Sequence, residues 1–230
     1  MTKIKLCGLK RPCDIEWANA LMPDYVGFVF APKSRRCVSP EGVKALRAGL
    51  ASGIRAVGVF VNEAPEAVAT LLNDGMIDIA QLHGGEDEAY IKALRMLTDR
   101  PLIKAFRVDG PADLDPAYQS SADYILLDNG AGGTGAAFDW EILKDFDRPC
   151  FLAGGLGPEN VARAIQAVRP FAVDVSSGIE TNGVKDLIKM RSFVEAVRHA
   201  QMTPPVSCAD SPLREGAKAS LFEGGGAAKP

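Results

Sequence analysis

The chain has 230 residues, of which 47% are hydrophobic and 24% charged, enough for one large or two small globular domains. A net charge of −3 gives no basic footprint for nucleic acid, and no apolar stretch is long enough to span a bilayer or to form a signal-peptide core. Five cysteines without paired spacing indicate reduced thiols in a cytoplasm, and without a CxxC or HxH pair the sequence predicts no metal site.

Strand patterns recur along the chain. Short alternating or continuous apolar runs predict eight strands: Lys3–Cys7, Tyr25–Phe30, Arg55–Val61, Ile77–Leu82, Pro101–Phe106, Tyr124–Leu127, Cys150–Ala153 and Phe171–Val175. Helical spacing and start signals predict helices between and after them: Asp14–Leu21, a helix beginning at Ser39-Pro40-Glu41, Pro65–Leu72, Glu86–Leu97, Phe138–Phe146, Pro158–Val168 and Lys185–Ala200. The segment Asp109–Ser121 carries only a weak helical signal.

This order of elements predicts the fold class. Eight strand-then-helix units in about 200 residues are the number in a small (β/α)8 TIM barrel, an α/β fold. An open doubly wound sheet is the alternative, but it usually has fewer strands, and the first loop lacks its GxGxxG fingerprint. We therefore predict a single-domain barrel over residues 1–200. Residues 201–230 are rich in Pro, Gly, Ala and Ser, so we expect a disordered tail there.

The sixth predicted strand ends at an ionisable residue, Asp128. A loop with Gly130, Gly132, Gly133 and Gly135 follows, which is too permissive to be helix or strand. Chemistry in α/β barrels lies at the carboxyl ends of the strands. A lone Asp there can simply cap its loop, but the other strands also end in polar or glycine-rich residues. This pattern favours a site at that rim.

The turns after the last two strands predict a phosphate site. Gly154 and Gly155 follow the seventh strand, and Ser176, Ser177 and Gly178 follow the eighth. In barrels, these two loops often bind phosphate through backbone N–H groups, which glycine lets approach closely. The alternative is two tight turns without a ligand, but their coincidence in the two expected loops favours phosphate.

Three further features lie at the same rim. Cys7 ends the first strand, and with Asp128 it could supply a base and an acid, although a lone strand cysteine is more often an inert thiol. Lys33-Ser34-Arg35-Arg36 follows the second strand and is either a solvated loop or a clamp for a carboxylate. His83, after the fourth strand, either lines the pocket or bonds its own loop.

Seven strings, in this order, resemble phosphoribosylanthranilate isomerase of tryptophan biosynthesis: KLCGLK, GFVFAPKSRR, AVGVFVNE, IDIAQLHGGE, LLDN with its glycine-rich loop, LAGGLGPENV and VDVSSGIE. The match covers about Lys3 to His199. It implies an Amadori rearrangement of N-(5-phosphoribosyl)anthranilate to 1-(2-carboxyphenylamino)-1-deoxyribulose 5-phosphate, without a cofactor. The departures are a loop variation at Asn182-Gly183-Val184 and a longer tail.

The resemblance also implies roles for individual residues. The general base of the family maps onto Cys7 and its general acid onto Asp128. The arginine that approaches the anthranilate carboxylate maps onto Arg36. The phosphate loops map onto Gly154, Gly155, Ser176, Ser177 and Gly178, and we expect His83 among the substrate-binding residues.

Two competing interpretations remain open at this point. Another phosphosugar barrel such as indole-glycerol-phosphate synthase relies on catalytic Lys and Glu residues, whereas the first strand here ends in Cys7. A non-catalytic phosphate-binding or thiol-sensing protein would leave Asp128 without a task. We expect a cytoplasmic monomer rather than a dimer, whose partner is its small substrate and neither nucleic acid nor a membrane.

Overall fold

A computed structural model describes residues 1–128 and 140–202 of the chain. The predicted glycine-rich loop after the sixth strand and the predicted disordered tail, apart from Gln201 and Met202, lie outside the described residues. Among the described residues, no helix is long and apolar enough to cross a membrane.

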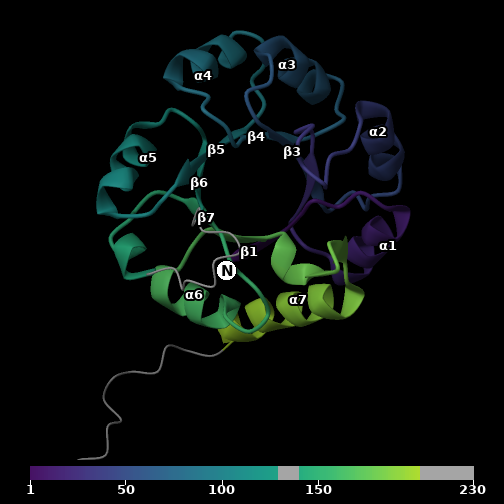
Figure 1. Ribbon diagram of the computed structural model, residues 1–230, viewed down its shortest axis with the longest axis vertical. Helices are drawn as coiled ribbons and strands as arrows, with labels where there is room; N and C mark the ends of the chain where they lie inside the picture. Colours follow the sequence, from purple (N-terminus) through teal and green to yellow (C-terminus); the bar gives the residue numbers. More distant parts are fainter. Residues whose placement is uncertain (129–139, 203–230) are drawn as a thin grey trace, which may run out of the picture.

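Eight parallel strands form a closed barrel in chain order, as the sequence predicts (Figure 1). They are β1 (Lys3–Cys7), β2 (Tyr25–Val29), β3 (Arg55–Phe60), β4 (Ile79–Leu82), β5 (Leu102–Arg107), β6 (Tyr124–Asp128), β7 (Cys150–Ala153) and β8 (Ala172–Val175). The barrel closes because β1 pairs with both β2 and β8.

Helices surround the barrel, as the view down its axis in Figure 1 shows. They are α1 (Pro12–Leu21), α2 (Pro40–Ala48), α3 (Pro65–Asn73), α4 (Glu88–Arg95), α5 (Asp115–Gln119), α6 (Val161–Val168) and α7 (Leu187–Met202). Three short 3-10 turns are η1 (Pro111–Leu114), η2 (Trp140–Leu143) and η3 (Ser177–Ile179), and a small hairpin pairs β9 (Glu180–Thr181) with β10 (Val184–Lys185). This single-domain arrangement confirms the predicted TIM barrel.

Local side-chain chemistry decides where the helices begin. The Ser39 hydroxyl accepts a hydrogen bond from the Gly42 N–H at 3.1 Å, which confirms the predicted start of α2. Helix α4 begins at Glu88 rather than at Glu86, because Asp87 caps it by accepting from the Tyr90 N–H at 2.9 Å. The Glu86 carboxylate instead accepts hydrogen bonds from backbone N–H groups of two loops.

Helices predicted in the second half of the chain also differ from the observed ones. The helix predicted over Phe138–Phe146 is the 3-10 turn η2 in its described part. The helix predicted from Pro158 begins at Val161. The helix predicted from Lys185 begins at Leu187, because Lys185 pairs with Glu180 in the β9–β10 hairpin.

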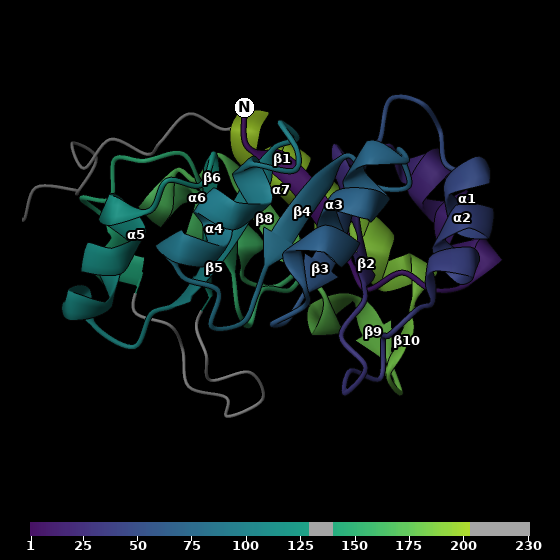
Figure 2. The same ribbon diagram turned by 90° about the horizontal axis from the view of Figure 1, so that it is seen from above.

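Side chains that point inward fill the interior of the barrel. The inner cluster is fully or nearly buried and consists of Tyr25, Val57, Ile79, Ile103, Leu126, Phe151, Ala153 and Ala172. A larger apolar cluster lies between the strands and the helices. In side view, β9 and β10 lie at the edge of the barrel opposite the N-terminus, where the strands have their carboxyl ends (Figure 2).

The last helix, α7, is hydrogen-bonded to the N-terminal part of the chain. Gln201 Nε2 donates to the Thr2 carbonyl at 2.7 Å, and Arg198 Nη2 donates to the Leu21 carbonyl at 2.8 Å. Helix α7 thus runs two residues beyond the predicted domain boundary at residue 200.

Candidate active site

A cavity of about 260 Å³ opens at the carboxyl ends of the barrel strands. The predicted site residues that line it are Cys7, Arg36, His83, Asp128, Gly154, Gly155, Ser176 and Ser177. Gly178 lies in η3 and is not part of the lining. The fold therefore brings residues from six separate segments to one cavity.

Cys7 ends β1, and its side chain is almost buried at the cavity wall. The thiol leans over β2, because a Cβ built on Gly27 would stand 2.6 Å from the Cys7 Sγ. Burial raises the pKa of Cys7 above its ordinary value, while the positive charges of Lys5 and Lys185 act in the opposite direction. Glycine in β2 thus provides the space in which the thiol sits.

The floor beneath Cys7 contains a buried ion pair that the sequence analysis missed. Lys5 Nζ lies 2.9 Å from Asp174 Oδ2, and the Lys5 side chain has no exposed surface. The two residues face each other across β1 and β8. Burial alone would lower the pKa of Lys5, but the neighbouring negative charge of Asp174 helps to raise it, so Lys5 stays an ammonium. The alternation of β1 carried this signal, since Lys5 shares a strand face with Cys7.

Asp128 ends β6 and contacts His83 across the cavity wall. His83 Nε2 lies 3.3 Å from Asp128 Oδ2, and His83 Nδ1 lies 2.8 Å from the Gln81 side-chain nitrogen. With the Gln81 amide assigned as the donor, His83 Nδ1 is the acceptor of that hydrogen bond, and Nε2 is the ring nitrogen that faces Asp128. His83 lines the cavity, which is the first of its two predicted alternatives.

The loops after β7 and β8 are built around glycine. Gly154 and Gly155 have φ angles of +87° and +65°, a left-handed conformation that glycine adopts without strain. A Cβ on Gly178 would stand 2.0 Å from the Leu156 carbonyl oxygen, so the two loops approach each other backbone to backbone. Their backbone is therefore exposed to the cavity with few side chains in the way.

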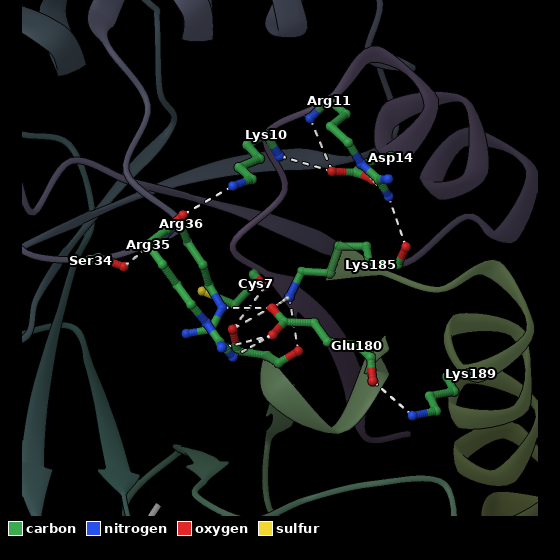
Figure 3. A network of polar contacts seen from close by, with 11 residues as sticks. Cys7, Lys10, Arg11, Asp14, Ser34, Arg35, Arg36, Glu180, Lys185 and Lys189 are labelled. Atoms are coloured by element: carbon green, nitrogen blue, oxygen red, sulfur yellow. Dashed lines mark hydrogen bonds and ion pairs between the residues drawn. The ribbon is translucent and has the colours of Figure 1, made fainter. Parts of the chain in front are cut away.

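Arg36 reaches the cavity from the loop after β2 and is already paired with Glu180. Its Nε donates to Glu180 Oε1 at 2.6 Å and its Nη2 to Oε2 at 2.8 Å (Figure 3). These hydrogen bonds raise the pKa of Arg36 above its ordinary value. The sequence analysis did not anticipate Glu180, which lies in β9 next to the segment treated as loop variation. The dipeptide Asn182-Gly183 is the signal that could have revealed this hairpin.

The described part of the chain offers acid–base groups and anion sites in one place. Cys7, Asp128 and His83 can exchange protons, while Arg36 and the glycine loops can hold negative charge. In residues 1–128 and 140–202, no three His, Cys, Asp or Glu side chains lie grouped as metal ligands. The four described cysteines, Cys7, Cys13, Cys37 and Cys150, are free thiols.

Known proteins resemble this chain in sequence over most of its length. A family model described as N-(5'phosphoribosyl)anthranilate (PRA) isomerase matches residues 4–196. An N-(5'-phosphoribosyl)anthranilate isomerase of Endomicrobium trichonymphae is 45% identical over 204 residues, which cover 86% of this chain and 99% of that protein. Its counterpart from Caldanaerobacter subterraneus subsp. tengcongensis is 46% identical over 204 residues, or 86% and 98% of the two chains.

Solved structures agree with these relatives. The crystal structure of phosphoribosyl anthranilate isomerase from Thermotoga maritima matches with a TM-score of 0.80 at 37% identity, covering 86% of this chain and all of that one. A phosphoribosyl anthranilate isomerase in complex with reduced 1-(o-carboxyphenylamino)-1-deoxyribulose 5-phosphate matches with a TM-score of 0.78 at 36% identity and the same coverage. At this similarity over nearly the full length of its relatives, the chain belongs to the N-(5'-phosphoribosyl)anthranilate isomerase family.

Proposed function

We propose that the chain carries out the reaction of its family, in tryptophan biosynthesis, with Asp128 as the general acid and Cys7 as the general base. The reaction is the Amadori rearrangement of N-(5'-phosphoribosyl)anthranilate to 1-(2-carboxyphenylamino)-1-deoxyribulose 5-phosphate. The observation that carries the residue assignment is that Cys7 and Asp128 line one cavity, at the carboxyl ends of two different strands.

The first half of the reaction needs an acid. Asp128, in its protonated form, gives a proton to the ribose ring oxygen, and the bond between that oxygen and C1′ breaks. The nitrogen lone pair then forms an iminium ion at C1′. His83 contacts Asp128 at Oδ2, and we assign the proton transfer to the other carboxyl oxygen of Asp128.

The second half needs a base. The iminium acidifies the hydrogen at C2′, and the Cys7 thiolate removes it, so that the electron pair moves to the iminium nitrogen. The resulting enolamine tautomerises to the amino-ketone, in which C2′ carries the carbonyl. Lys5 supports the thiolate form, because its ammonium is one of the positive charges that act on Cys7 against burial.

The two anionic ends of the substrate require separate binding sites. For the phosphate we propose backbone N–H groups at Gly154–Gly155 and Ser176–Gly178, supported by the glycine-built turns there and by the open space beside Gly155. For the anthranilate carboxylate we propose Arg36, a guanidinium at the cavity wall. The bound product analogue in the related structure carries both groups, a carboxyphenyl and a phosphate.

We also propose that the enzyme acts in the cytoplasm as a monomer. Free thiols among the described cysteines fit a reducing compartment. Large exposed apolar side chains include Met22, which follows α1, Met96, which follows α4, and Ile188 in α7. A relative from Thermotoga maritima is described as dimeric, so light scattering of the purified chain at several concentrations tests this assignment.

A coupled assay tests the activity itself. The unstable substrate is generated in situ from anthranilate and a phosphoribosyl donor, and loss of anthranilate-type fluorescence is followed. We expect turnover that depends on this chain and is lost in the Cys7→Ala, Asp128→Ala double variant. Turnover that persists in the double variant would contradict the proposed acid and base.

A further inference from the structure

One carboxylate, Glu180, binds three cationic side chains from two parts of the fold. Its Oε1 accepts from Arg36 Nε at 2.6 Å and from Lys185 Nζ at 2.7 Å. Its Oε2 accepts from Arg36 Nη2 at 2.8 Å and from Arg35 Nη2 at 2.9 Å. Figure 3 shows the two arginines converging on Glu180 from the loop after β2 and Lys185 reaching it from β10.

Glu180 lies behind Arg36 rather than in the cavity. Its side chain is only 4% exposed and is not part of the cavity lining, whereas Arg36 is 20% exposed and lines the cavity. The three cations exceed the single anion, so the cluster keeps a surplus of positive charge beside the cavity. Glu180 therefore cannot be a substrate contact, but it controls a residue that can be one.

The hairpin that carries Glu180 is itself tightly held. Asn182 and Gly183 both have positive φ angles, +53° and +76°, as a two-residue hairpin turn of type I′ requires. Lys189 Nζ donates to the Glu180 carbonyl at 2.7 Å, and Arg11 Nη2 donates to the Lys185 carbonyl at 2.8 Å. These bonds give the Glu180 carboxylate a fixed position relative to the barrel.

The same hairpin reaches the loop after β8. Lys185 Nζ donates to the Ser176 carbonyl at 2.8 Å, and the Ser176 hydroxyl donates to the Cys7 carbonyl at 3.2 Å. One buried ion cluster thus connects the Arg36 guanidinium, the Ser176 loop and the end of β1. Hydrogen bonds at both Nε and Nη2 fix the plane of a guanidinium. Its Nη1 group then remains available to donate to another acceptor. Among the described residues, Arg36 Nη1 has no hydrogen-bond partner.

We propose that Glu180 is a positioning residue for the isomerase reaction, which fixes the Arg36 guanidinium so that its Nη1 edge meets the substrate carboxylate. This inference rests on the proposed role of Arg36. Removal of the Glu180 carboxylate frees the guanidinium to rotate and leaves Arg35, Arg36 and Lys185 to repel one another. The loss therefore falls first on recognition of the carboxylate, because the Glu180 side chain accepts its hydrogen bonds, within the described residues, from Arg35, Arg36 and Lys185.

The test uses two inhibitors that differ by a single group: reduced 1-(o-carboxyphenylamino)-1-deoxyribulose 5-phosphate and its analogue without the carboxyl group. The ratio of their inhibition constants measures carboxylate recognition alone. We expect Glu180→Gln to reduce this preference by about tenfold or more, to raise KM, and to change kcat much less. Asp78→Asn is the matched control, because it breaks a carboxylate–arginine pair with Arg47, at 3.0 Å, before β4 begins.

Arg36→Met separates failure of this inference from failure of the proposed function. If Arg36→Met leaves the preference unchanged, the proposed role of Arg36 is wrong, and the role of Glu180 fails with it. If Arg36→Met removes the preference but Glu180→Gln retains it, only the positioning role is refuted. In the Arg36→Met background, Glu180→Gln should have no further effect on the ratio.

A second variant keeps the test decisive if Glu180→Gln folds poorly. Glu180→Asp retains the negative charge among the three cations but shortens the side chain, so it cannot reach both Arg36 nitrogens in the same geometry. We expect this variant to melt close to the wild type and still to lose carboxylate preference. A Glu180→Asp variant that is folded and has the full wild-type preference would overturn the inference.

Discussion

The Cys7 thiol occupies space that exists only because residue 27 is glycine. A Cβ on Gly27 would stand 2.6 Å from the Cys7 Sγ and 3.1 Å from the Cys7 Cα. The two residues are register partners on β1 and β2, so neither backbone can move away without disturbing the barrel. Glycine at this position therefore sets where the proposed base stands.

Gly27→Ala should displace the thiol and lower kcat at least tenfold. Overpacking of this kind typically costs about 1–3 kcal/mol of stability. In a Cys7→Ala background the clash with Sγ is gone, so Gly27→Ala should destabilise that variant less than it does the wild type. Urea unfolding of the four proteins gives this comparison, and equal destabilisation in both backgrounds would show that the thiol does not depend on Gly27.

Gly155→Val should raise KM strongly while the barrel stays folded. Gly155 has a φ of +65° and no protein atom within 4 Å of a built Cβ, so a side chain there enters open space at the cavity. Gly75→Val is a matched control, since Gly75 has a φ of +69° and the same open surroundings away from the cavity. Both variants carry similar backbone strain, roughly 1–2 kcal/mol. An unchanged KM in Gly155→Val would remove these N–H groups from the phosphate site.

Local sequence signals were sufficient to predict the barrel and the residues at its rim. Cys7 and Asp128 could be placed because each ends an apolar strand run, and all parallel strands end at the same edge. Gly154 and Gly155 could be placed for the same reason. No tertiary information was needed for these residues, since strand direction alone brings them to one side.

The contacts that tune those residues could not be predicted in this way. Arg36 and Glu180 are 144 positions apart and meet only because barrel closure brings the β8 loop beside β1 and β2. The alternation of β1 places Lys5 on the same strand face as Cys7, but nothing local shows that Lys5 pairs with Asp174, 169 positions away. The Asn182-Gly183 turn could have been predicted from its sequence. That this hairpin brings Glu180 to Arg36, however, depends on closure of the barrel.

A chain that ends at Met202 should keep the activity and the melting temperature of the full chain. We propose from their composition, which is rich in Pro, Gly, Ala and Ser, that residues 203–230 are dispensable. A chain that ends at His199 should melt lower, because it loses the end of α7 and the Gln201 bond to Thr2. A fall in melting temperature on truncation at Met202 would show that the tail packs on the barrel.

The Glu180 cluster should make stability depend on pH in acid. Burial alone would raise the pKa of Glu180, but its hydrogen bonds and charge interactions with Arg36 and Lys185 lower it from 4.5 to about 2. Because the folded-state pKa is depressed, the stabilisation is present above about pH 4.5 and is lost as the pH falls towards 2. Urea unfolding at about pH 6 and at about pH 3 measures the free energy of unfolding of the wild type and of Glu180→Gln. The difference between the two proteins should be smaller at the lower pH. An equal difference in unfolding free energy at both pH values would mean that Glu180 is not ionised in the cluster.

Cys7→Ser and Asp128→Asn should each lower kcat by about 10²–10⁴, the range for general acid–base groups. Substrate binding should change little, because neither side chain belongs to the proposed anion sites. The double variant should lose less than the product of the two single losses, since both groups serve one reaction path. Cys13→Ser, which alters a free thiol on α1, is the control and should retain full kcat.

The pH profile identifies which group is the base. Burial raises the pKa of Cys7 above its ordinary value, so thiolate formation should contribute an increase in kcat/KM in the alkaline range, which loss of the Asp128 proton opposes in the wild type. This increase should persist in Asp128→Asn and disappear or move in Cys7→Ser, whose hydroxyl does not ionise there. Near-normal turnover by either single variant, with folding verified by circular dichroism, would mean that Cys7 and Asp128 serve only as strand-end structure. The free energy that separates these outcomes is about 3–5 kcal/mol of activation, far above any packing change that such isosteric substitutions cause.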